Sequence, residues 1–129
     1  MIDGHFIRAL ESCTLSEQEF NHAGHVRAAY LYLQSGDFAE ALMRLRRSIR
    51  NYADSLGKPD RYHETITVAY LALIQQLLCE RGDGGGWTGF ARVAPELFEP
   101  DLLLKFYAKS QLDSQLARRI FVLPGAEFR

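Results

Sequence analysis

The chain has 129 residues, of which 47% are hydrophobic and 24% are charged, and its formal net charge is −1. This composition excludes intrinsic disorder, and the length predicts one domain over residues 1–129. Because the charge is near zero and no long basic run occurs, we expect no nucleic-acid partner.

Helical periodicity dominates the first two thirds of the chain. We predict a short helix over about 3–11 and a second helix over about 16–34, opened by a capping box of Ser16 and Glu19. Two further long helices are expected over about 38–56 and 61–81.

Shorter elements are predicted in the C-terminal third. Four glycines within residues 82–86 predict a mobile connection that could gate a site. Short helices are expected over about 88–93, 100–107 and 110–121, and an extended tail over 122–124. The predicted fold is all-α: a single-domain antiparallel helical bundle of three long helices plus several short C-terminal helices.

The sequence also lacks the signals of export and of membrane insertion. It has no signal-peptide pattern at its start, and no apolar run approaches the roughly 18 residues of a membrane span. Cys13 and Cys79 are too few for a disulfide framework or a thiolate zinc site. We therefore expect a cytoplasmic protein without a membrane partner, acting alone or as a homodimer.

Three of the four histidines fall on core-facing helix stripes. At about 100° per residue, His22 and His25 share one face, and His63 shares a face with Tyr70. Two helices separated by one intervening helix run parallel, so the starts of the helices over 16–34 and 61–81, which bracket the helix over 38–56, can lie side by side. This topology predicts a cluster of His22, His25 and His63, with Glu64 at its rim. The competing interpretation is that each histidine is a hydrogen-bonded core residue.

Such a cluster is suited to acid–base chemistry. A histidine and a partly buried glutamate of raised pKa could exchange protons with a small organic substrate, in a condensation or cyclisation that needs no cofactor. The predicted catalytic residues are His22, His63 and Glu64. The predicted substrate-binding residues are His25, Tyr62, Thr67, Tyr70, Trp87 and Tyr107.

Two alternatives to this enzyme hypothesis stay open. His22 and His25, at i and i+3, could share one divalent metal ion with His63, and Glu64 could act as a further ligand or as a base. Residues 28–45 resemble one unit of a tetratricopeptide array, which would favour a peptide-binding adaptor without catalysis.

Three strings of the sequence resemble a family of short, all-helical bacterial proteins without an assigned activity. They are residues 20–26 (FNHAGHV), 62–67 (YHETIT) and 118–124 (RRIFVLP). The likeness implies a shared site around these strings. In size the chain is also similar to small bacterial Pictet–Spenglerases. That similarity implies an arylethylamine and an aldehyde as substrates, with Glu64 or a histidine removing the indole ring proton.

Overall fold

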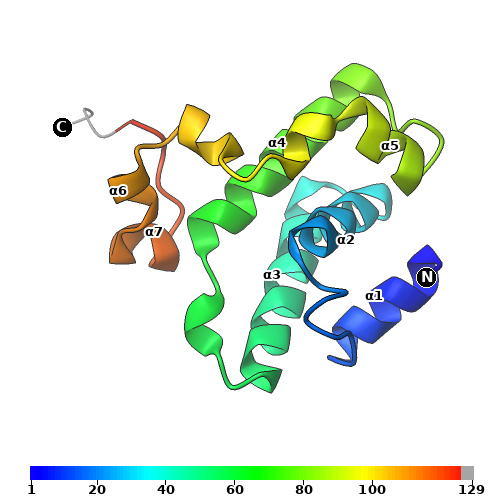
Figure 1. The fold of residues 1–129 in the computed structure, drawn as a ribbon, viewed down its shortest axis with the longest axis horizontal. Coiled ribbons are helices and arrows are strands. Elements are labelled where there is room, and N and C mark those ends of the chain that lie inside the picture. The colour runs from blue at the N-terminus through cyan, green and yellow to red at the C-terminus, as the bar shows by residue number, and fades with distance from the viewer. Residues whose placement is uncertain (126–129) are drawn as a thin grey trace.

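The computed structural model describes residues 1–125, in which seven α-helices and three 3-10 helices occur and no strand is present. The all-α prediction is therefore confirmed. The long helices are α2 (His22–Gln34), α3 (Phe38–Ser55) and α4 (Glu64–Arg81), which pack on one another at the centre of the molecule (Figure 1). Helix α1 (Asp3–Glu11) packs against α2 and α3.

Short elements flank this centre at both ends of α4. Helix α5 (Trp87–Val93) lies near the C-terminal end of α4, and α6 (Lys109–Leu112) and α7 (Gln115–Arg119) lie near its start (Figure 1). The 3-10 helix η1 (Pro59–Arg61) lies between α3 and α4, and η2 (Pro95–Phe98) and η3 (Leu102–Lys105) lie between α5 and α6. The helix predicted over 100–107 is replaced by the shorter η3. The helix predicted over 110–121 is divided into α6 and α7, and the Ser114 side chain caps the start of α7.

Helix α2 begins six residues later than the capping box predicts. The Ser16 and Glu19 side chains do accept each other's backbone N–H, at 2.9 and 3.1 Å, but this arrangement closes a single turn. The helix proper starts at His22, where the Asn21 side chain accepts from the Gly24 N–H at 3.0 Å. A Cβ at Gly24 would lie 2.6 Å from the Glu19 carbonyl oxygen, so the turn and the helix can approach this closely only at a glycine.

Helix α4 also begins later than predicted, at Glu64 instead of Arg61. Pro59 starts the separate 3-10 turn η1, and His63 adopts an extended conformation as the residue that caps α4. The start of α3 agrees with its prediction, because Asp37 accepts from the Glu40 N–H at 2.9 Å.

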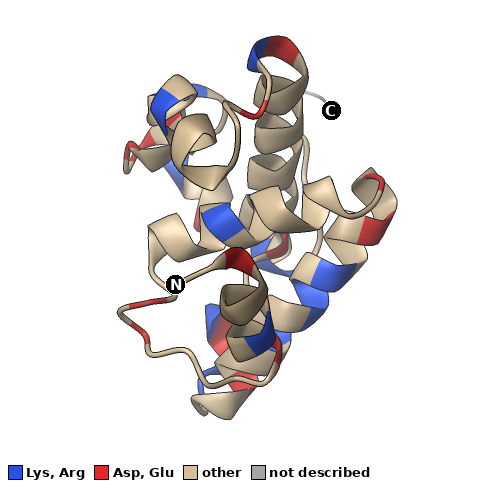
Figure 2. Ribbon diagram, turned by 90° about the vertical axis from the view of Figure 1, so that its right-hand side faces the viewer, with Lys and Arg blue, Asp and Glu red and all other residues tan. Residues whose placement is uncertain are grey.

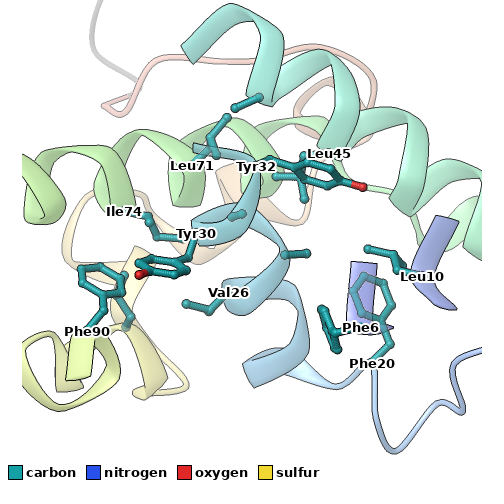
Figure 3. Packing of buried hydrophobic residues seen from close by; sticks show 14 of the residues in the cluster. Phe6, Leu10, Phe20, Val26, Tyr30, Tyr32, Leu45, Leu71, Ile74 and Phe90 are labelled. Atoms are coloured by element: carbon teal, nitrogen blue, oxygen red, sulfur yellow. The ribbon is translucent and has the colours of Figure 1, made fainter. Parts of the chain in front are cut away.

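One large hydrophobic cluster joins α1 to α5. The cluster includes Val26 of α2, Leu45 of α3, Leu71 and Ile74 of α4 and Phe90 of α5, which are labelled in Figure 3. A second, smaller cluster of Leu103, Tyr107 and Leu112 packs on the outer side of α4. Residues 122–124, predicted as an extended tail, form no helix, and the Val122 N–H donates to the Thr65 hydroxyl at 3.1 Å.

Charged residues of both signs are interspersed along the elements (Figure 2). Within residues 1–125, no helix has both the length and the apolar character needed to cross a bilayer.

Candidate ligand cavity

A cavity of about 320 Å³ lies between α2, α3 and α4. Its polar side chains come from the start of α2 and the first half of α4, and its apolar side chains come from all three helices. The lining residues are Phe20, Asn21, His22, His25, Val26, Ala29, Leu45, Ile49, Ile66, Thr67, Tyr70 and Ile74. The cavity therefore brings together four of the predicted site residues, namely His22, His25, Thr67 and Tyr70.

His22 presents one ring nitrogen that is fixed and one that is open. Its Nε2 lies 2.8 Å from the Leu97 carbonyl oxygen, which can only accept, so Nε2 carries the proton. No hydrogen bond to Nδ1 occurs within the described part of the chain, which leaves the Nδ1 lone pair available. The ring meets the Tyr70 ring edge to face, with 5.2 Å between centroids. The residue is exposed to solvent, contrary to the predicted burial, although its ring lines the cavity.

His25 lies deeper and is held as a neutral imidazole. Its ring stacks on Phe20 with 4.0 Å between centroids. Burial, with a smaller contribution from the charge of His22, lowers the pKa of His25 from 6.5 to about 4. At neutral pH this side chain can donate and accept hydrogen bonds, but it is too weakly basic to serve as a general base.

Tyr70 and Thr67 complete the polar part of the wall. Burial raises the pKa of the Tyr70 hydroxyl, so the group is a proton-bearing donor at neutral pH. Within the described residues this hydroxyl has no hydrogen-bond partner in the protein. The Thr67 hydroxyl instead donates to the His63 carbonyl at 2.8 Å, which stabilises the first turn of α4.

His63, predicted to be catalytic, does not line this cavity. Its Nδ1 accepts from the Ile66 N–H at 3.1 Å, and its Nε2 donates to the Leu112 carbonyl at 2.7 Å. Both ring nitrogens are therefore engaged by the backbone, and the side chain acts as a helix cap. The separation from His22 follows from register, because Tyr70, the ring that meets His22, lies seven residues farther along, which is roughly 10 Å of helix.

Glu64 is likewise not available as a base, and the predicted rise in its pKa is wrong. The Arg46 guanidinium donates to both carboxylate oxygens, at 3.0 and 2.5 Å, and the Tyr62 hydroxyl donates to one of them. Burial raises the pKa of Glu64, but the hydrogen bonds from Arg46 and Tyr62 more than offset this and hold the pKa below its ordinary value. The carboxylate thus ties the start of α4 to α3.

The remaining predicted contact residues pack elsewhere. The Tyr62 hydroxyl donates to the Glu64 carboxylate, and the Arg50 guanidinium lies 4.5 Å from the centroid of the Tyr62 ring. Trp87 packs on Tyr30, with 5.7 Å between centroids. The Tyr107 hydroxyl donates to the Val122 carbonyl at 2.7 Å. Residues 82–86, predicted as a gate, contribute nothing to the cavity lining.

The predicted metal-ligand set is not assembled. Within residues 1–125 there is no group of three or more His, Cys, Asp or Glu side chains placed to hold a metal ion. His22 and His25 share the cavity, but His63 is directed to Leu112.

Sequence reasoning missed two kinds of residue at this site. The Leu97 carbonyl, which fixes the His22 tautomer, is 75 residues away in the chain and carries no sequence signal. Phe20 and Asn21 fall in the interior of the predicted 16–34 helix, although asparagine is itself one of the residues that most often cap a helix start.

Comparison of the chain with protein-family models, curated protein sequences and solved structures gives no match.

Proposed function

We propose that this protein binds a small organic molecule in the histidine cavity and exchanges a proton with it through His22. The observation that carries the proposal is that His22, whose Nδ1 has no hydrogen bond within the described residues, lines a mainly apolar cavity of about 320 Å³. That volume is at the lower end of the range for small-molecule sites, which are mainly apolar with a few placed polar groups.

The division of roles follows from the state of each side chain. His22 would accept the proton at Nδ1, with its tautomer and orientation held by the Leu97 carbonyl. Tyr70 would donate a hydrogen bond to the substrate, and neutral His25 would orient it. The reaction class is proton transfer in a condensation, isomerisation or cyclisation.

A simple probe of this chemistry is 5-nitrobenzisoxazole, a flat uncharged compound. Removal of its carbon-bound proton by a base breaks the ring N–O bond and releases a coloured nitrile phenolate. We expect the protein to accelerate this opening and His22→Ala to lose the acceleration. Tyr107→Phe removes a hydroxyl outside the cavity and serves as a control that keeps the rate. An unchanged rate in His22→Ala would refute the assigned role.

Binding is tested separately from catalysis. Phenol, followed by amide chemical shifts in a ¹⁵N–¹H spectrum, should perturb residues of α2 and α4 around the cavity. Tyr70→Phe should weaken phenol binding several-fold, since it removes one hydrogen bond. Perturbations confined to other elements would contradict the site assignment.

The more specific predictions from the sequence are proposals of the same kind. A Pictet–Spengler reaction would be detected as cyclisation of tryptamine with acetaldehyde, in which a histidine, and not the Arg46-bound Glu64, removes the ring proton. A cytoplasmic location suits the free thiols of Cys13 and Cys79. The adaptor alternative predicts that phenol does not bind and that His22→Ala has no chemical consequence.

A further inference from the structure

A second cavity adjoins the first. It has a volume of about 470 Å³ and lies between α4, η3 and α6. Three residues, His22, Ile66 and Tyr70, line both cavities, so the two cavities meet at these side chains. The remaining lining residues are Pro100, Asp101, Leu103, Leu104, Lys109, Leu112 and Asp113.

The two cavities differ in where they place polar groups. In the described residues, no Asp, Glu, Lys or Arg side chain lines the first cavity, whose polar groups are imidazole, hydroxyl and amide. The second cavity has charged groups, but these are on exposed residues and include the Lys109–Asp113 ion pair at 2.6 Å. Its apolar surface comes from proline, leucine and isoleucine side chains.

Two of these apolar side chains are partly uncovered. Ile66 is 37% exposed and Leu104 is 41% exposed, although both lie beside buried neighbours. An apolar chain placed along this surface would remove their side chains from water, which is favourable in proportion to the area covered.

We infer that the ligand of the His22 site is an elongated molecule with an uncharged polar head and an apolar tail. The head occupies the first cavity, within reach of His22, His25 and Tyr70. The tail runs past His22, Ile66 and Tyr70, the side chains that line both cavities, and lies along Leu103, Leu104 and Leu112. This inference rests on the proposed function, because the position of the head is that of the proposed substrate.

The test compares three probes with related rings. Phenol represents the head alone, 4-pentylphenol the head with a tail, and benzoate a charged head. Isothermal titration of the full chain should give 4-pentylphenol a Kd at least tenfold lower than that of phenol, and benzoate a Kd at least tenfold higher. Equal affinities for phenol and 4-pentylphenol would overturn the tail assignment, and tight benzoate binding would overturn the uncharged head.

A pair of variants locates the tail. Leu104→Trp fills the second cavity from an exposed position, and Leu116→Trp makes the same change at a position that is 58% exposed and lines neither cavity. We expect Leu104→Trp to lose the tenfold gain of 4-pentylphenol while its Kd for phenol stays unchanged, and Leu116→Trp to keep both. Unchanged far-ultraviolet dichroism verifies the fold of each variant.

The outcomes separate the two proposals. If phenol binds at the first cavity and 4-pentylphenol gains nothing, the proposed function stands and this inference fails. If phenol shows no binding, the proposed function fails and the head assignment fails with it. A 4-pentylphenol gain that Leu104→Trp leaves intact overturns the second cavity as the tail site.

Discussion

Protonation of His25 should destabilise the fold at mildly acidic pH. The folded protein holds the pKa of this imidazole at about 4, below the ordinary 6.5, because charging it would place a cation in the stack with Phe20 beside His22. The unfolded chain therefore binds this proton more readily than the folded chain does. The contribution of neutral His25 to the free energy of unfolding is fully present above pH 6.5 and is lost as the pH falls toward 4.

The magnitude follows from the two pKa values. Between the two pKa values, each pH unit changes the free energy of unfolding by about 1.4 kcal/mol. Lowering the pH from 7 to 4.5 should therefore reduce this free energy by about 2.5 kcal/mol through His25 alone. In urea unfolding this is a shift of the midpoint by roughly 1–2 M. His25→Phe preserves an aromatic ring on Phe20 and abolishes the titration.

The assay is urea denaturation of both proteins at pH 7 and pH 4.5. The loss of unfolding free energy between the two should be about 2.5 kcal/mol smaller in His25→Phe than in the wild-type chain. His5→Phe, at an exposed histidine of α1, is the matched control and should retain the wild-type loss. Equal losses in His25→Phe and the wild-type chain would refute the argument that burial keeps His25 neutral.

Three further predictions concern residues that stabilise the fold. His63→Ala should lower the free energy of unfolding by about 1–3 kcal/mol, since it removes the α4 cap and the partner of the Leu112 carbonyl. His63→Asn should recover the cap. A large change in phenol affinity would contradict a structural role. Glu64→Gln should lower the free energy of unfolding by about 1–3 kcal/mol at pH 7, because it breaks the ion pair with Arg46. The loss should shrink as the pH falls through the lowered pKa of Glu64, because the wild-type carboxylate then loses the same pair. A loss that does not depend on pH would exclude this cause. Gly89→Ala should lower the melting temperature markedly, because its Cβ would lie 1.8 Å from the Gly84 carbonyl oxygen, and an unchanged melting temperature would show that the 82–86 connection yields freely.

Much of the fold is encoded locally. The periodicity of apolar residues places α1 and α3 close to their observed bounds, and the Asp37 cap is recognisable from its residue type. Failures occur where two local signals compete. The capping box at Ser16 forms as predicted, but the cap at Asn21 and the close approach at Gly24 start the helix anew.

The candidate site was likewise predictable only in part from the sequence. Periodicity gives the angle of a residue about its helix axis, and this suffices to place His22 and His25 on one face and Thr67 and Tyr70 on another, the four predicted residues that the cavity joins. It does not give the displacement of one helix along the next. That displacement sets Tyr70, and not His63, opposite His22.

The sequence by itself therefore determined the all-helical class, most helix positions and the inward faces that form the cavity. The tertiary structure decided which histidine has both ring nitrogens bonded to the backbone. Leu97 and Leu112 bring backbone carbonyls to His22 and His63 across 75 and 49 residues, and Arg46 neutralises Glu64 from another helix. Every residue has a backbone carbonyl, so residue type does not show where these acceptors lie. Only the packed chain shows that both ring nitrogens of His63 bond to the backbone, whereas His22 has one such bond within residues 1–125.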